Sequence, residues 1–249
     1  MLGGGYVGLK FSQAFRRFGS RVTVIEAGPQ LAGREDSDVG AALLDLFVDE
    51  GIEVLLVTEI RQVEGHSGHR VRVHANGAQG NRTIEGSDLL VATGRKANTD
   101  GIGLELTGVQ LDEHGYIKVN DRLLTTSENI WSMGDCAGSP QFTHVTFDDF
   151  RIVQDSPNGG SRTTKSRLIP FCMFTDPKLA RVGRNEAEAQ RDGVEYRLVK
   201  MPMAAVQTAM AGHLPYMTLR DAIFTHPTMS EGLNQLLAGV SKKSTHPSA

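Results

Sequence analysis

The sequence is short of cysteine, of long apolar runs and of net charge. Its two cysteines, Cys136 and Cys172, lie far apart and fit neither a disulfide framework nor a zinc pattern, as in a reducing compartment. No apolar run approaches the roughly 18 to 20 residues that are needed to cross a bilayer. The N-terminus does not begin with basic residues followed by a long apolar stretch. A net charge of -3 offers no basic surface for nucleic acid. We therefore expect a cytoplasmic protein without a metal site and without membrane or nucleic-acid partners.

The chain is long enough for more than one domain. Its 249 residues, 39% hydrophobic and 22% charged, suffice for one large hydrophobic core or two modest ones. The stretch from Gln154 to Ser166 is polar and rich in Ser, Gly, Thr and Asn, which is typical of a linker. Two domains are therefore favoured, with a boundary in this stretch.

A glycine-rich turn opens the sequence. Gly3, Gly5 and Gly8 fit G-x-G-x-x-G, in which the first glycine permits a tight turn, the second lets a pyrophosphate approach the backbone and the third allows close contact between helix and strand. Apolar residues at helical spacing continue up to Gly19, namely Val7, Phe11, Phe15 and Phe18. The pattern predicts a helix whose N-terminus binds phosphate.

A carboxylate follows at the spacing of a dinucleotide site. The β-branched run from Arg21 to Glu26 predicts a buried parallel strand, and Glu26 ends it where a carboxylate accepts hydrogen bonds from ribose hydroxyls, about 20 residues after the turn. Its charge would repel the 2′-phosphate of NADP, so NAD is favoured, while Arg34 keeps NADP open. The alternative is a glycine-rich loop followed by an ordinary surface glutamate.

The next segments continue the alternation of helix and strand. A helix is predicted from Ser37 or Asp38 to Gly51, and a strand from Ile52 to Val57. Alternating residues and two glycine-containing turns predict an antiparallel meander between Ile60 and Glu85. The apolar run 89–93 suits a further buried strand. The inward face of the helix is expected to consist of Val39, Leu43, Leu46 and Phe47.

Five motifs occur in an order that is hard to obtain by chance. They are Gly3-Gly4-Gly5-Tyr6-Val7-Gly8, Ala92-Thr93-Gly94-Arg95, Gly134-Asp135-Cys136-Ala137-Gly138, Phe174-Thr175-Asp176-Pro177 and His226-Pro227-Thr228-Met229-Ser230-Glu231. In this order they resemble the class I pyridine nucleotide-disulfide oxidoreductases, which include dihydrolipoamide dehydrogenase, glutathione reductase and mercuric reductase. The resemblance spans nearly the whole chain and is nearest to mercuric reductase.

The resemblance implies an α/β fold with a Rossmann-like NAD(P)-binding domain, part of an FAD-binding domain and a truncated α+β dimerisation domain. The expected NAD(P)-binding domain covers residues 1–95, and the C-terminal part of the FAD domain covers residues 96–153. A linker at 154–166, the dimerisation domain at 167–240 and a polar tail at 241–249 complete the expected organisation. The family forms homodimers, so a homodimer is expected here.

The resemblance also implies cofactors and the residues that hold them. Electrons would pass from NAD(P)H to FAD and then to a small-molecule, disulfide or metal acceptor. Gly94 would lie at the cofactor, Asp135 would hydrogen-bond the ribityl chain of FAD, and the backbone amides near Thr143 and His144 would face the flavin pyrimidine edge. Without the resemblance, Gly134-Asp135 is a simple turn.

The resemblance places a catalytic dyad near the C-terminus. Glu231 would orient His226, which would take a proton from a thiol of the partner subunit. Without the resemblance, a histidine before a proline is usually a turn residue with its hydrogen bonds satisfied. Cys172 is interpreted as a core residue and Cys136 as a structural one.

Four departures from the family lead us to expect an incomplete enzyme. The sequence begins inside the strand that precedes Gly3, so the apolar neighbours of Met1-Leu2 are expected to lack a partner. The family's FAD-pyrophosphate turn and redox-active cysteine pair are not in the sequence. Lys10 stands where the family commonly has glutamate, and residues 199–210 run on where the family has several strands. A non-catalytic remnant, an NAD-binding module and an incomplete gene model are the alternatives.

Overall fold

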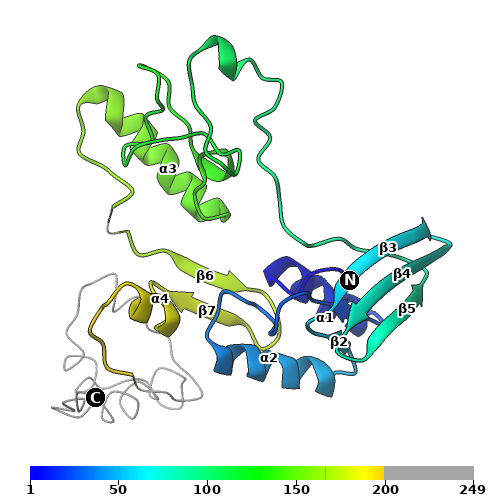
Figure 1. Ribbon diagram of the computed structural model, residues 1–249. Helices are drawn as coiled ribbons and strands as arrows, with labels where there is room; N and C mark the ends of the chain where they lie inside the picture. The colour runs from blue at the N-terminus through cyan, green and yellow to red at the C-terminus, as the bar shows by residue number, and fades with distance from the viewer. Residues whose placement is uncertain (166, 199–249) are drawn as a thin grey trace. The chain divides into compact units, whose positions relative to one another are not determined.

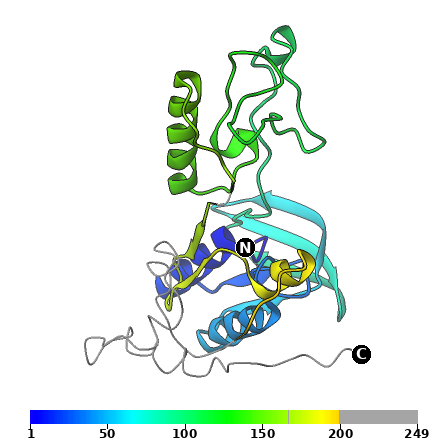
Figure 2. The same cartoon turned by 90° about the vertical axis from the view of Figure 1, so that its left-hand side faces the viewer.

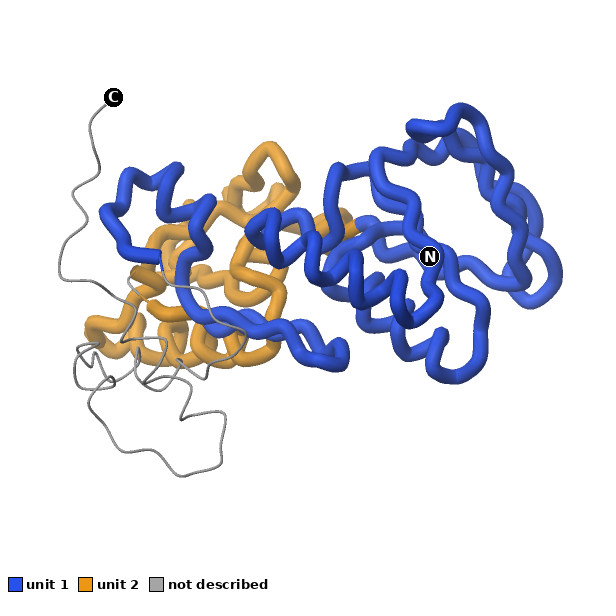
Figure 3. Tube along the Cα trace, turned by 90° about the horizontal axis from the view of Figure 1, so that it is seen from below, with its two compact units in different colours: residues 1–93, 170–249 blue, residues 94–169 orange. Residues whose placement is uncertain are grey.

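The computed structural model describes residues 1–165 and 167–198, which form two compact units. The described part of the first unit comprises residues 1–93 and 170–198, and the second lies within residues 94–169 (Figure 3). Helices and strands alternate in the first unit, which gives the α/β architecture that the sequence predicts (Figure 1). The finer division at residues 95, 153 and 166 stays a prediction.

A parallel sheet forms the centre of the first unit. Strand β1 (Thr23–Ile25) pairs in parallel with β2 (Glu53–Leu55), as predicted. Leu2 extends this sheet through parallel bridges with Ile25 on one side and Val91 on the other. The strand positions therefore lie in the order Val91, Leu2, β1 and β2.

Two expectations about this sheet are wrong. Met1-Leu2 does not leave its neighbours without a partner, because Ile25 N donates to Met1 O and Leu2 N donates to Leu90 O, each at 2.9 Å. Two residues are thus enough to supply ladder bonds on both sides. The run 89–93 is not a wholly buried strand either, since Val91 is 63% exposed. Its only bridge among the described residues is to Leu2, so it lies at the edge of the described sheet.

Successive residues of β1 point to opposite faces of the sheet, and each face has its own core. Val24 faces the helices α1 (Tyr6–Arg17) and α2 (Ser37–Asp49). The core on that face includes the predicted inward residues Leu43 and Phe47, with Val39 and Leu46 packed against it. Its buried members are Leu9, Val22, Val24, Leu31, Ala32, Leu43, Phe47, Ile52 and Met173.

The structure contains the predicted antiparallel meander, and it covers the opposite face of the parallel sheet (Figure 1). It consists of β3 (Glu59–His66), β4 (Arg70–Gly77) and β5 (Gly80–Gly86), paired in that order. Gly77 pairs with Gly80 at the turn between β4 and β5. The core on this side is formed by Leu2, Ile25, Val71 and Val73.

Helix α1 buries a face that its apolar spacing does not indicate. Apolar spacing usually marks the core side of a helix, yet the predicted stripe is exposed, with Phe11 at 44% and Phe18 at 83%. The Phe11 and Phe15 rings stack at 6.1 Å between centroids. The buried face is more polar and consists of Gly8, Leu9, Ser12 and Gln13, of which Gly8 permits the close approach of the helix to the strand.

The segment after residue 169 forms a hairpin and a short helix in the first unit. Strands β6 (Pro170–Met173) and β7 (Leu179–Val182) are antiparallel, and α4 (Glu186–Arg191) follows with a capping box formed by Asn185 and Glu188.

This segment contacts residues 1–93 through the buried side chains of Gln13 and Met173. The side chain of Gln13, in α1, donates to Asp176 O at 2.9 Å and accepts from Asp176 N at 2.7 Å. Met173 is fully buried in the helix-side core, and Cys172 before it is partly buried in β6.

The second unit is mostly loops around helix α3 (Thr143–Asp155), which Figure 2 shows as a regular helix. Residues 116–119 and 129–133 form only isolated bridges, to Leu111, Thr125 and Leu124. Short 3-10 turns occur at η1 (Leu104–Leu106), η2 (Gly134–Ala137) and η3 (Ser156–Asn158). The apolar residues buried here are Val109, Ile117, Leu123, Val145 and Ile152.

Candidate functional site

The three glycines of the first turn have the geometries that a phosphate turn needs. Gly3 has φ +97°, and a Cβ there would lie 2.5 Å from Ala92 O, so only glycine fits. A Cβ at Gly8 would overlap Gly3 O, which shows how closely the helix approaches the strand. At Gly5, by contrast, a Cβ would meet nothing within 4 Å. The backbone at Gly5 is therefore open to a ligand.

Gly5 is also the N-cap of α1, and no side chain caps this helix. The first backbone amides of an α-helix have no partner within the helix, and the helix dipole favours an anion there. Together with the open space at Gly5, this end of α1 has the character of a pyrophosphate site.

Glu26 lies directly beside this turn. Its Oε2 accepts a hydrogen bond from Gly4 N at 2.6 Å, and its Oε1 accepts one from Gly28 N at 2.7 Å. Each carboxylate oxygen has a second lone pair and so retains capacity for a ribose hydroxyl. The structure thus brings the turn and the carboxylate together, as a shared ligand would require. Arg34, which kept NADP open, is an exposed residue of the loop after Glu26.

The second unit contains a cavity of about 560 Å³ at the N-terminus of α3. Asp135 lies in η2 at this cavity, and its carboxylate accepts a hydrogen bond from Arg95 at 3.1 Å. Gly94, with φ +127°, directly precedes Arg95, and His144, in the first turn of α3, stacks on Phe142 with 5.2 Å between ring centroids. The cavity is lined by Arg95, Met133, Asp135, Gln141, Phe142, Thr143, Thr146, Phe147 and Phe150.

Asp149 holds the Asp135 turn in place, and the sequence analysis missed it. Its side chain is fully buried in α3, and Oδ2 accepts from Gly134 N at 2.8 Å. Arg167 lies 2.6 Å from Oδ1 and neutralises the buried charge. The only local signal in the sequence is that the acidic residue Asp149 falls on the buried face of α3. Its partner Arg167 is 18 residues away, so the sequence does not indicate the pair.

Removing the partner of Asp149 is expected to destabilise the second unit strongly. Arg167→Met leaves a buried carboxylate without its counter-charge, which costs about 3 kcal/mol or more. Adding Asp149→Asn should recover more than half of this loss. The measurement is urea unfolding followed by fluorescence of Trp131, the only tryptophan of the chain.

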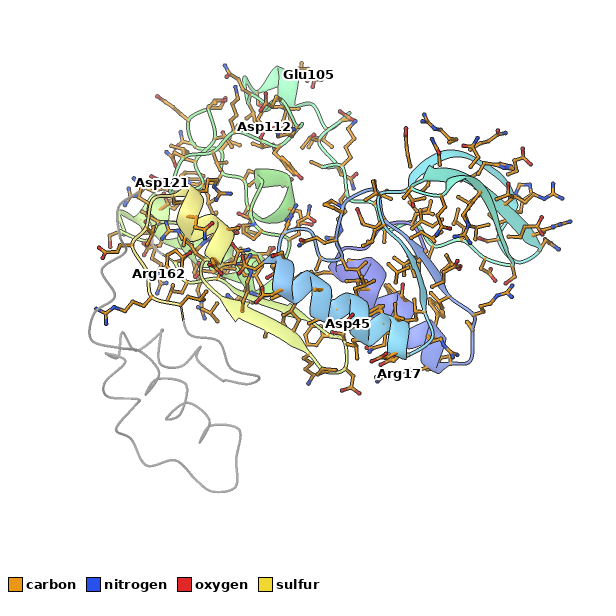
Figure 4. The ribbon with its side chains drawn as sticks, turned by 60° about the horizontal axis from the view of Figure 1, so that its bottom comes forward. Arg17, Asp45, Glu105, Asp112, Asp121 and Arg162 are labelled. Atoms are coloured by element: carbon orange, nitrogen blue, oxygen red, sulfur yellow. The ribbon has the colours of Figure 1, made fainter. Side chains whose placement is uncertain are left out.

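An exposed ion pair in the same unit provides the control. Lys165 lies 2.6 Å from Asp121, labelled in Figure 4, with both side chains largely in solvent. Lys165→Met should leave the unfolding midpoint almost unchanged. If Arg167→Met had equally little effect, Asp149 would not depend on Arg167.

Cys136, Cys172 and Lys10 are not part of either candidate site. Cys136, in η2, contacts Ser132 Oγ at 3.4 Å, and both cysteines are free. Lys10 Nζ lies 5.9 Å from the Phe174 ring centroid. His226 and Glu231 lie outside the described residues, so their proximity stays a prediction. The described residues include no group of three or more His, Cys, Asp or Glu side chains that could hold a metal ion.

The first unit combines a parallel sheet, a glycine turn, an open helix N-terminus and a carboxylate at the end of the next strand. These features are typical of the class of α/β proteins with a dinucleotide-binding fold. Comparison with known families makes this class specific. The model described as pyridine nucleotide-disulphide oxidoreductase matches residues 1–149, and that family's dimerisation-domain model matches residues 169–220. The chain therefore belongs to the pyridine nucleotide-disulphide oxidoreductase family.

The chain resembles several members of this family over most of its length. It is 35% identical to the probable pyridine nucleotide-disulfide oxidoreductase RclA of Escherichia coli K12, over 96% of this chain and 63% of that protein. It is 36% identical to a mercuric reductase of Streptomyces lividans, over 84% of this chain and 44% of that protein. The structure of the HOCl-induced flavoprotein disulfide reductase RclA from Escherichia coli matches with a TM-score of 0.84 and 34% identity, over 96% and 64% of the two chains.

The chain is shorter than these relatives and spans less than two thirds of their length. The alignment with the Escherichia coli protein runs over 281 positions, more than the 249 residues of this chain. That protein therefore has residues inside the aligned region that this chain lacks. Among the helices of the described part, none has the length and apolar character that crossing a membrane requires.

Proposed function

We propose that this chain binds NADH and belongs to an FAD-dependent oxidoreductase that passes electrons to a disulfide or metal acceptor. The observation that carries the proposal is the arrangement of Gly5 and Glu26. The backbone at Gly5 is open at the N-terminus of α1, and Glu26 hydrogen-bonds the neighbouring residue Gly4 at 2.6 Å. One adenine dinucleotide reaches both, with its pyrophosphate on the helix and its ribose on the carboxylate.

The charge at the glycine turn supports NADH over NADPH. Glu26 carries negative charge where the 2′-phosphate of NADP would lie, and no arginine side chain is hydrogen-bonded to Glu26 among the described residues. Gly3 and Gly8 give the turn its shape, because neither tolerates a Cβ. These residues bind and orient the dinucleotide.

The cavity in the second unit fits part of a flavin. Asp135 supplies a carboxylate for ribityl hydroxyls, and the first turn of α3 at Thr143 and His144 presents the positive end of a helix dipole to the same cavity. FAD held there would supply the chemistry of hydride acceptance from NADH and of electron donation to the acceptor. The roles of Arg95 and Asp149 are to orient Asp135 and to anchor its turn.

The dimeric organisation and the dyad complete the proposal. The match to the dimerisation-domain model at residues 169–220 supports a homodimer. In such a dimer, Glu231 would orient His226 toward a thiol of the partner's site. Disulfide and metal substrates are proposed together as electron acceptors.

Titration with reduced nicotinamide nucleotides tests the proposal. We expect saturable enhancement of NADH fluorescence, binding of NADPH that is weaker by about tenfold or more, and displacement of NADH by ADP, which carries the same pyrophosphate. Nicotinamide mononucleotide should displace NADH poorly. Failure of NADH to saturate, or tighter binding of NADPH, would overturn the proposal.

The second candidate function is an NAD-binding module without turnover. Lys10 favours it, because a cation stands near the start of α1 where the family commonly has glutamate. Purified protein distinguishes the candidates. Flavin absorbance together with NADH oxidation supports the oxidoreductase, while a colourless protein that binds NADH supports the module.

A further inference from the structure

A cluster of buried and partly buried charged and polar groups joins the start of α1 to the segment that matches the dimerisation domain. It consists of Tyr6, Glu35, Arg181 and Glu188, which we call the clasp. Tyr6 follows Gly5 directly and is the first residue of α1, whereas Arg181 lies on β7. The clasp therefore connects residues that are far apart in the sequence.

Arg181 is the central group of the clasp. Its Nε lies 3.1 Å from Glu35, and its Nη1 lies 3.2 Å from Glu188. Its guanidinium also stacks over the Phe171 ring at 3.9 Å from the centroid. The side chains of Arg181 and Glu35 are only 14% and 3% exposed, so solvent screens their attraction little. A buried pair of this kind is sensitive to the loss of either partner.

Glu35 connects Arg181 to the residue that follows the glycine turn. The Tyr6 hydroxyl donates a hydrogen bond to Glu35 at 2.7 Å. Burial, and then the negative Glu35 beside it, raise the pKa of the Tyr6 hydroxyl far above its usual range, so it stays protonated and keeps donating. The position of Tyr6, and with it the first turn of α1, is fixed by a carboxylate that Arg181 holds.

A second route runs through the backbone of the same loop. Asn185 Nδ2 donates to Arg34 O at 2.7 Å, and the Asp36 carboxylate accepts from Glu186 N and Ala187 N at 3.0 Å each. Within the loop, Ala32 N donates to Gly4 O at 2.8 Å. The loop that follows Glu26 is thus held between β7 with α4 on one side and the glycine turn on the other.

We propose that Arg181 is a positioning residue for the dinucleotide site, which it controls through Glu35 and Tyr6. The inference rests on the proposed binding of NADH to the glycine turn. It adds that affinity for NADH depends on the segment that matches the dimerisation domain, although Arg181 itself does not touch the nucleotide. When residues that do not touch the ligand hold the binding residues in position, removing their contacts lowers the affinity for the ligand.

The test compares Arg181 with a second ionic contact between the same two segments. Arg17, labelled in Figure 4, bridges Glu50 and Asp176 at 2.8 Å each, away from the glycine turn. It therefore connects the β6–β7 hairpin to residues 1–93 without contacting Tyr6. If β7 merely has to stay attached, Arg17→Met and Arg181→Met should affect NADH binding alike.

The inference predicts different results for the two variants. Arg181→Met should weaken NADH and ADP binding by the same factor of about ten, because both ligands use the pyrophosphate site. Arg181→Lys, which keeps the charge but lacks the planar guanidinium that contacts both carboxylates and stacks on Phe171, should recover only part of the lost affinity. Arg17→Met should leave affinity unchanged. Tyr6→Phe, which keeps the buried ion pair, should weaken binding by about fivefold and covers the case in which Arg181→Met does not fold.

Each outcome decides between the claims. If the unmodified chain binds no NADH, the proposed function fails and the inference fails with it. If the unmodified chain binds NADH but Arg181→Met and Tyr6→Phe bind equally well, only the inference is overturned. Equal weakening by Arg17→Met and Arg181→Met also overturns the inference, because attachment of the hairpin would then explain both.

Discussion

Gly5→Ala is expected to remove NADH binding while leaving the fold intact. The added Cβ meets no protein atom within 4 Å, so the folded chain accommodates it. Replacing an N-cap glycine by alanine costs only about 0.5 kcal/mol of helix stability. The same Cβ would occupy the space through which a pyrophosphate approaches the backbone, so affinity should fall by about a hundredfold or more.

The matched control for Gly5→Ala lies three residues further along the chain. A Cβ at Gly8 would overlap Gly3 O, so Gly8→Ala should lower the free energy of unfolding by about 2 kcal/mol or more. Urea unfolding followed by circular dichroism, with NADH titration of each variant, separates the two effects. Strong NADH binding by Gly5→Ala, or unfolding of Gly5→Ala as marked as that of Gly8→Ala, would contradict the assignment of the ligand to Gly5.

Glu26→Gln is expected to reduce the preference for NADH over NADPH by about tenfold or more. The amide has no negative charge to repel the 2′-phosphate, yet its oxygen still accepts a hydrogen bond from a ribose hydroxyl. The measurement is the ratio of the NADH and NADPH dissociation constants, obtained by fluorescence at low salt, where charge repulsion is least screened.

The same substitution should also destabilise the first unit. Glu26 accepts from both Gly4 N and Gly28 N, and an amide side chain accepts through one atom only. The loss of one such bond costs about 2 kcal/mol. Glu26→Asp is the control, since it keeps the charge on a shorter side chain and should retain the preference for NADH. An unchanged preference in Glu26→Gln would show that Glu26 does not face the 2′-position.

The local parts of the dinucleotide site were predictable from the sequence because they depend on short-range geometry. The order Gly3, Gly5 and Gly8 reflects a turn, an open backbone and a close helix contact, and the structure shows each of these three environments. The position of Glu26 follows from the length of one helix and one strand. The meander was predictable because alternation and the glycine turn before Gly80 are local signals.

The groups that support the site were not predictable in this way. The buried face of α1 is formed by Gly8, Leu9, Ser12 and Gln13, and a single apolar side chain among them makes no periodic pattern that would mark this face. Asp149 pairs with Arg167, 18 residues away in the sequence, and Glu35 pairs with Arg181, 146 residues away. Pairing at such distances is decided by the tertiary fold, and single-sequence periodicity contains no information about it.

Met1-Leu2 shows a further limit of local reasoning. A strand of two residues was expected to leave its neighbours unpaired, but its amides and carbonyls bond to both sides. The buried side chain of Leu2 then belongs to the core beneath the meander. A central position in a parallel sheet is stabilised by its neighbours more than by its own length.

A crystal structure of the chain grown with NADH tests the central claim most directly. We predict pyrophosphate oxygens within hydrogen-bond distance of the first backbone amides of α1, and the adenine ribose hydroxyls on the Glu26 carboxylate. NADH bound elsewhere, or bound with its pyrophosphate away from Gly5, would contradict the claim.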